Sequence, residues 1–191
     1  MNENVLFLPN LEVREEGGDQ VLEGLACPFY DGDIRTQYDM PESGLIERFA
    51  KGAFDKWLGQ NPAIEARVNH DPAKTFAVSP ETLTLWTDKQ GLKYRAKLPM
   101  DVSWVRDMVA LVRRGVIRGS SIRFAPVAKT WSREGTNDIC TIREAVIEEV
   151  SPVYRPAYKA SQALLRSRDE YIASLALEPY EKRLAEILHS I

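Results

Sequence analysis

The feature that most limits the fold of this chain is a series of short extended segments separated by polar turns. In residues 63–69, Ile64, Ala66 and Val68 alternate with polar residues, which is the period-two pattern of a half-buried strand. Residues 88–91, Asp-Lys-Gln-Gly, are typical of a hairpin turn between two such strands. Further strands are predicted over residues 5–8, 21–29, 44–49, 83–86, 92–98, 116–127, 140–150 and 152–154.

Two helices are predicted among these strands. The first spans residues 52–60, and the second spans residues 101–114. The second has one apolar face, formed by Trp104, Met108, Leu111 and Val112. Asp101 can cap its start, and Gly115 is placed to end it. Many short strands with two inserted helices predict a mainly β, α+β chain folded as an antiparallel barrel or sandwich.

The end of the chain has a different pattern. Residues 167–189 are predicted to be helical, and Pro179 divides them because a proline removes a helical hydrogen bond. Apolar and charged residues are interleaved there, so the segment needs a surface on which to bury its apolar stripe, either on its own chain or on a second copy. We therefore divide the chain into a β domain, residues 1–166, and a C-terminal helical segment, residues 167–191.

Composition excludes several classes of function. The formal net charge is −3 and no basic run occurs, so a nucleic-acid partner is not expected. No apolar stretch reaches the roughly 18 residues of a membrane span, and the first residues lack the pattern of a signal peptide, so a cytosolic protein is expected. Two histidines and two cysteines, none of them paired in sequence, predict no metal site, and we expect no cofactor.

Three places carry groups suited to catalysis. His70 ends an alternating strand within Asn69-His70-Asp71-Pro72, where it can act as a base near neutral pH, although chemistry alone favours an ordinary turn histidine. Gly119-Ser120-Ser121 allows a close backbone approach, which suits a nucleophile with an oxyanion pocket and also a tight β-bend. Glu149 lies in an apolar strand, where a carboxylate needs a partner such as a histidine unless the strand is at an edge.

These segments together resemble the prohead maturation proteases of tailed phages, which are related in fold to the herpesvirus capsid protease, assemblin. The resemblance covers roughly residues 20–165 and rests on five motifs in a fixed order. They are Glu-Arg-Phe-Ala-Lys-Gly-Ala-Phe-Asp at 47–55, Asn-His-Asp at 69–71, Asp-Lys-Gln-Gly-Leu at 88–92, Gly-Val-Ile-Arg-Gly-Ser-Ser-Ile-Arg-Phe at 115–124, and Glu-Val-Ser-Pro-Val with Pro-Ala-Tyr at 149–158.

The resemblance implies an assemblin-like antiparallel β-barrel and a set of catalytic residues. Ser121, which precedes Ile-Arg-Phe, corresponds to the nucleophile, and His70 to the base. Assemblins use a second histidine, but the only other histidine here is His189, so an acidic third member is expected. Glu149 is the first choice and Asp71 the second. Two arginines are further candidates for assisting the oxyanion, Arg123 and Arg155, and Arg123 departs from the small residue usual at its position.

The function implied is that of a serine endopeptidase acting by acyl transfer. Its expected substrates are the phage scaffold, or the scaffolding segment of the major capsid protein, and the protease itself. The expected location is the immature capsid in the host cytoplasm, and homo-oligomerisation is left open. Two alternatives remain: a non-catalytic capsid-associated β-barrel protein, and a thiol hydrolase using Cys140 with His70.

Overall fold

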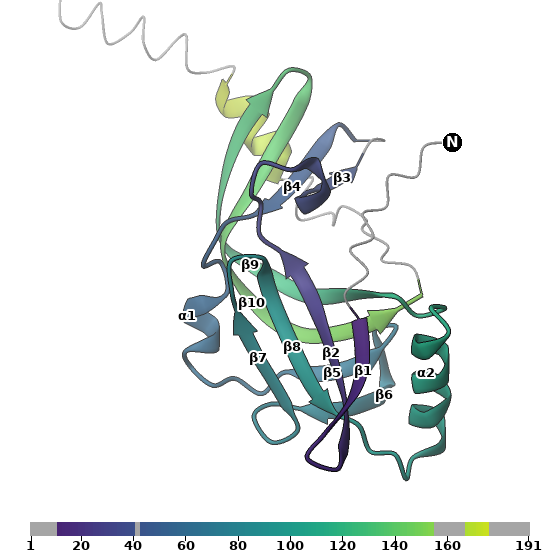
Figure 1. Ribbon diagram of the computed structural model, residues 1–191. Helices are drawn as coiled ribbons and strands as arrows, with labels where there is room; N and C mark the ends of the chain where they lie inside the picture. Colours follow the sequence, from purple (N-terminus) through teal and green to yellow (C-terminus); the bar gives the residue numbers. More distant parts are fainter. Residues whose placement is uncertain (1–10, 41–42, 155–166, 176–191) are drawn as a thin grey trace, which may run out of the picture.

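Two β-sheets form the body of the protein in the computed structural model, which describes residues 11–40, 43–154 and 167–175 (Figure 1). The first sheet has the order β1 (Leu11–Glu16), β2 (Asp19–Pro28), β8 (Gly91–Lys97), β7 (Leu83–Thr87). The second has the order β3 (Tyr38–Met40), β4 (Leu45–Phe49), β10 (Asn137–Val153), β5 (Glu65–Val68), β6 (Asp71–Val78), and β9 (Gly119–Glu134) also pairs with β10. The helical elements between these strands are η1 (Ile34–Thr36), α1 (Asp55–Leu58) and α2 (Ser103–Arg113).

The prediction of a mainly β chain with inserted helices is confirmed, with several differences in detail. Strands β1, β3 and β6 were not predicted, and the first helix is a single turn. The strand expected at residues 5–8 lies outside the described residues. Strands β9 and β10 are 16 and 17 residues long, much longer than their apolar runs predicted. Across the described ranges, no helix is long and apolar enough to cross a membrane.

The expectation of an entirely antiparallel barrel needs correction. Strand β10 pairs in parallel with β4 over residues 138–142 and in parallel with β5 at Glu149 and Val150. Its length explains this arrangement, because one long strand offers the same edge first to β4 and then to β5. The two sheets are not closed into one barrel, so that part of the expected assemblin-like architecture is not confirmed.

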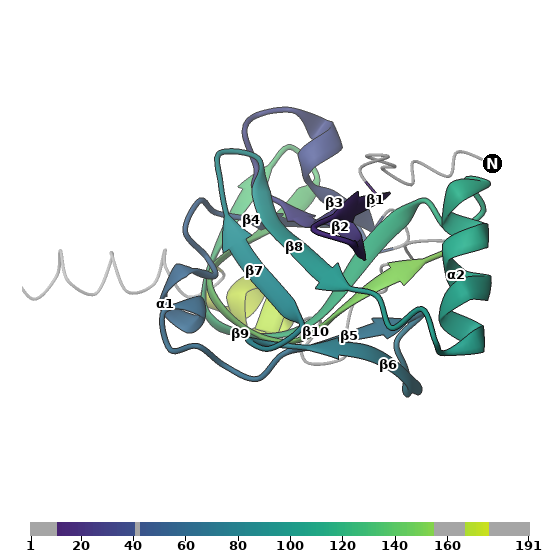
Figure 2. The ribbon, with the colours of Figure 1, turned by 60° about the horizontal axis from the view of Figure 1, so that its bottom comes forward.

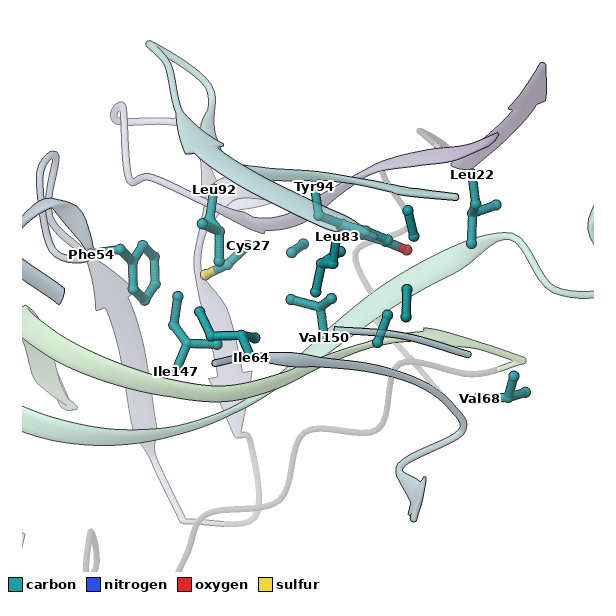
Figure 3. Close-up of a cluster of buried hydrophobic side chains, with 14 of the residues drawn as sticks. Leu22, Cys27, Phe54, Ile64, Val68, Leu83, Leu92, Tyr94, Ile147 and Val150 are labelled. Atoms are coloured by element: carbon teal, nitrogen blue, oxygen red, sulfur yellow. The ribbon is translucent and has the colours of Figure 1, made fainter. Parts of the chain in front are cut away.

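The core lies between the two sheets (Figures 2 and 3). Buried side chains from both sheets meet there, among them Leu22, Leu92 and Tyr94 from the first and Val68, Ile147 and Val150 from the second. Because β5, β9 and β10 contribute to this core, their alternation determines which of their polar residues face the other way.

Helix α2 packs at the end of the sheets opposite α1 (Figures 1 and 2). Its fully buried residues are Val105, Met108, Val109 and Val112, so the apolar face is rotated slightly from the predicted one. The N-cap is Val102, which makes no side-chain cap, so the prediction of an Asp101 cap is wrong. Gly115 ends the helix with a φ of +68°, as predicted, and β9 starts at Gly119.

The C-terminal segment is helical over its described part, residues 167–175, and packs on the β9–β10 hairpin (Figure 1). The rings of Trp131 and Tyr171 stack with centroids 5.7 Å apart, and the indole N–H of Trp131 donates to Ser167 Oγ at 3.2 Å. Arg168 donates to the carbonyl oxygen of Ser43 at 2.7 Å. This part therefore packs on its own chain, whereas Pro179 and His189 lie outside the described residues.

One buried carboxyl group predicts how stability depends on pH. Glu47 on β4 is 2% exposed, and burial raises the pKa of its carboxyl from 4.5 to about 8, although the charge of Lys129 opposes this shift. Between these values the unfolded chain releases the proton that the folded chain keeps, so Glu47 destabilises the fold as pH rises through this window. The cost grows by about 1.4 kcal/mol per pH unit.

We expect Glu47→Gln to remove this pH dependence, because glutamine stays neutral. The free energy of unfolding of both proteins would be measured in urea at pH 5 and pH 8. The difference between the variant and the unmodified protein should be larger at pH 8 than at pH 5, by a few kcal/mol in favour of the variant. An equal difference between the two proteins at both pH values would show that Glu47 is ionised in the folded state.

Candidate active site

His70 lies at the tip of a tight hairpin. Val68 of β5 pairs with Asp71 of β6, which leaves Asn69 and His70 as a two-residue turn. Both have positive φ, at +52° and +62°, the pattern of a type I′ turn. Asparagine and histidine adopt this left-handed region more often than most residues other than glycine, but it still has an energetic cost, which contacts of the turn can offset.

Three hydrogen bonds join this turn to the end of β10. The N–H of Asn69 donates to the carbonyl oxygen of Pro152 at 3.1 Å, and Asn69 Oδ1 accepts the N–H of Tyr154 at 3.2 Å. The N–H of His70 donates to Ser151 Oγ at 3.2 Å. The parallel pairing of β5 with β10 brings these segments together, although they are about 80 residues apart in sequence.

Glu149 lies against the imidazole ring of His70. Its Oε1 contacts His70 Nδ1, and its Oε2 accepts the hydroxyl proton of Ser151 at 2.5 Å. The side chain of Glu149 is fully buried, whereas that of His70 is 32% exposed. A buried carboxylate needs such partners, because it has lost its hydration. The structure therefore brings together His70 and Glu149, two residues that the sequence singled out.

A β-bulge in β10 turns Glu149 toward His70. Ile147 and Val150 both point into the core (Figure 3), although strict alternation would place residues three apart on opposite faces. The pairing register with β9 shifts between Ile147 and Glu149, which leaves Glu148 as the extra residue. Beyond this bulge Val150 faces the core, so Glu149 and Ser151 face the opposite side of the sheet.

The same pairing orients the two neighbouring serines of β9. Ser121 pairs directly with Ser151, and residues directly opposite each other in an antiparallel pair project from the same face. Ser120 pairs with Pro152 and points the other way, toward the core, where its Oγ lies 3.0 Å from the hydroxyl of Tyr94. Ser121 is thus on the side of Ser151, Glu149 and the turn of His70.

Ser121 and His70 share a face but are not bonded. Among the described residues, no hydrogen bond joins Ser121 Oγ to the ring of His70. Nucleophile and base are often separated in an enzyme without substrate, and the bond then forms in the complex. Ser121 is partly exposed and so accessible, whereas Ser120 is occupied by a buried partner.

The absence of a side chain at Gly24 leaves room for the side chain of Ser120. A Cβ on Gly24 of β2 would come within 3.0 Å of Ser120 Oγ and of the ring of Tyr94. Burial raises the pKa of the Tyr94 phenol, which therefore stays protonated and hydrogen bonded to Ser120. These contacts fix the start of β9 and with it the direction in which Ser121 points.

Two arginines lie near Glu149. Arg123 pairs with Glu149 across the strands, its Nε is 4.0 Å from Glu149 Oε1, and its side chain is 53% exposed. Arg67 bonds to Glu65 at 2.7 Å, which raises the pKa of its guanidinium, and the charge of Glu149 adds to this shift. Arg155, the other arginine that the sequence suggested, lies outside the described residues.

The other acid beside His70 is occupied elsewhere. Asp71 Oδ1 accepts the N–H of Ala73 at 2.9 Å, so it stabilises the start of its own strand. Of the two acids that the sequence offered as a partner for His70, Glu149 is therefore the one in contact with the ring.

Cys140 is poorly placed for a thiol mechanism. It is fully buried, and burial raises the pKa of its thiol to about 12. It lies nine positions before Glu149 in the same strand, which corresponds to about 30 Å along an extended strand. Within the described part of the chain, no three His, Cys, Asp or Glu side chains are grouped as metal ligands would be.

Comparison with protein families identifies the chain. The family model described as caudovirus prohead serine protease matches residues 10–173. The chain belongs to this family. A search of curated proteins and a search of solved structures each gave no significant match. The matched residues include β1 to β10 and nearly all of the described C-terminal helix, and Ser121, His70 and Glu149 lie within them.

Ser151 is the site residue that the sequence did not reveal. Its motif, Glu149-Val150-Ser151, drew attention to the carboxylate but gave no reason to expect that the serine two residues later contacts both Glu149 and His70. The one available signal is the spacing, because residues two apart in a strand share a face.

Proposed function

We propose that this chain is the serine endopeptidase that cleaves scaffold or capsid-protein scaffolding segments, and itself, during prohead maturation. Membership of the prohead serine protease family supports the class of reaction and the phage procapsid as its location. The observation that carries the proposal is the contact of the buried Glu149 with His70 Nδ1 on the face of the sheet that Ser121 shares.

The proposed first step is attack by Ser121 Oγ on a peptide carbonyl carbon. An ionised carboxylate can only accept, so Glu149 holds the proton of His70 on Nδ1 and leaves Nε2 as the acceptor. Nε2 takes the proton of Ser121 as the Oγ–C bond forms. Glu149 then stabilises the imidazolium, which gives its proton to the leaving amine as the C–N bond breaks.

The second step returns the enzyme to its starting state. Water loses a proton to His70 and attacks the acyl ester, and Ser121 recovers its own proton as the ester bond breaks. The negative oxygen of each tetrahedral intermediate needs donors, and backbone N–H groups near Ser121 are proposed to supply them. Arg123 is exposed on the same face and is a candidate for a further donor, as is Arg155.

Active-site labelling tests the proposal directly. A fluorophosphonate probe should modify the full-length protein at one residue, Ser121, and peptide mapping by mass spectrometry would identify it. A non-catalytic capsid-associated protein would not react at all. Labelling of Cys140 by iodoacetamide, with loss of activity, would instead favour the thiol alternative, which its burial opposes.

The C-terminal segment is proposed to serve assembly or targeting and not chemistry. Its described helix contacts Trp131 and Ser43, at the far end of the β9–β10 hairpin from the site (Figure 1). A variant ending at residue 166 is therefore expected to cleave a short peptide at a rate within a few-fold of the full chain. Its oligomeric state in sedimentation, or its incorporation into proheads, is expected to change.

The matched control for this truncation is Tyr171→Ala, which removes only the ring stacked on Trp131. If the truncated protein folds, by circular dichroism, but no longer cleaves the peptide, the segment contributes to the active site and the proposed division of the chain is wrong.

A further inference from the structure

The hydroxyl of Ser151 lies between the base and the acid of the proposed site. Ser151 is fully buried, accepts the backbone N–H of His70 at 3.2 Å, and contacts Glu149 Oε2 at 2.5 Å. Because it pairs with Ser121 across the strands, it also borders the proposed nucleophile. It is the one described side chain that is hydrogen bonded to both His70 and Glu149.

Hydrogen-bonding capacity determines how these contacts are arranged. A serine hydroxyl has one proton to donate and two lone pairs. The backbone N–H of His70 can only donate, and an ionised Glu149 can only accept. The proton of Ser151 therefore goes to Glu149 Oε2, and a lone pair of Ser151 receives the N–H of His70. Glu149 Oε1 is left to face His70 Nδ1.

The base needs this support because of its backbone. His70 has a φ of +62°, which lies in the left-handed region that non-glycine residues adopt only at an energetic cost. The bond from its N–H to Ser151 favours that conformation, while the bond from Ser151 to Glu149 fixes the carboxylate that orients the ring. An error of about 1 Å in such a group is enough to cost about 10²-fold in rate.

We propose that Ser151 is a positioning residue that sets the backbone of His70 and the carboxylate of Glu149 at the same time. It acts through these two residues and does not touch substrate. The inference rests on the proposed function. A role for Ser151 as the nucleophile itself is disfavoured, because it is fully buried and its proton is donated to Glu149.

The test compares Ser151→Ala with the unmodified protein. We expect kcat for a peptide to fall by about 10²-fold with little change in KM. The chain has two histidines, so the proton on His70 Nδ1 can be assigned by NMR after ¹⁵N-histidine labelling. Its low-field resonance should move or broaden in Ser151→Ala. Ser151→Thr, which keeps the hydroxyl, should restore part of the rate and the resonance.

Ser79→Ala is the matched control. The Ser79 hydroxyl also accepts a backbone N–H, from Ile64 at 2.8 Å, and contacts a carbonyl oxygen, that of Pro62 at 2.6 Å. It is 8% exposed and lies at the opposite end of the β5–β6 hairpin from His70. A similar loss of stability is expected, with kcat and the His70 resonance unchanged. If Ser151→Ala does not fold, Ser151→Cys fills the same space with a much weaker donor and should show the same losses.

The outcomes separate the two proposals. If Ser151→Ala and Ser79→Ala lose equal stability and neither changes kcat or the resonance, Ser151 is only structural, and the inference fails while the proposed function stands. If the unmodified protein neither cleaves peptide nor reacts with the fluorophosphonate, the proposed function fails. The His70 Nδ1 proton resonance in Ser151→Ala then still tests whether Ser151 positions Glu149 against His70. Labelling at Ser151 would overturn both.

Discussion

Ser121→Ala should abolish peptide cleavage and leave the fold unchanged. Removing the nucleophile of a serine protease lowers kcat by about 10⁶-fold. Ser121 is partly exposed and lies on the face shared with Ser151, so losing one hydroxyl there should leave the core intact. Cleavage of a fluorogenic peptide, labelling by fluorophosphonate and the urea unfolding midpoint would measure the three consequences.

Ser120→Ala is the natural control, because the two serines are adjacent and face opposite sides of β9. Ser120 bonds to the buried hydroxyl of Tyr94, so its loss should cost about 1 kcal/mol of stability. Activity should change by no more than a few-fold. If Ser120→Ala were the inactive variant and Ser121→Ala stayed active, the assignment of the nucleophile would be off by one residue.

The sequence predicted the class of fold because it depends on local patterns. The alternation at residues 63–69, the turn before Gly91 and the apolar face of α2 are each contained in one segment. What it did not predict was the pairing of segments distant in sequence. The parallel pairing of β10 with β4 and β5 depends on the length of β10, which runs from Asn137 to Val153, whereas its apolar runs predicted separate strands at 140–150 and 152–154.

The sequence suggested Glu149 as the partner of His70 but did not predict the backbone geometry that allows their contact. That contact depends on the bulge at Glu148, which reverses the alternation of β10. Nothing in the residue types at 147–149 specifies that extra residue. The sequence places His70 at a turn but does not predict a hairpin there, because the strand that follows, β6, was not expected and Pro72 lies in it, beside the turn. The role of Ser151 depends on its hydrogen bonds to both His70 and Glu149, which the sequence does not reveal.

Glu149→Gln should lower kcat strongly while keeping the size of the side chain. An amide cannot stabilise the imidazolium by charge, and its N–H₂ group, if it faces the ring, forces His70 Nδ1 to become the acceptor. The other ring nitrogen, Nε2, would then carry the proton and could not act as a base. The corresponding change in a well-studied triad costs about 10⁴-fold in kcat, and we expect a loss on the order of 10²–10⁴ here.

Asp71→Asn supplies the matched comparison, because it makes the same change of acid to amide next to His70. The Oδ1 of asparagine can still accept the N–H of Ala73, so little effect on folding or on rate is expected. Both variants should be measured with the same peptide and the same fluorophosphonate, since the labelling rate reports the reactivity of Ser121 without product release. A large loss in Asp71→Asn together with a normal rate in Glu149→Gln would make Asp71 the partner of the base. In that case the buried contact of Glu149 with the ring would have only a structural role, and the sequence's second choice of acid would be the correct one.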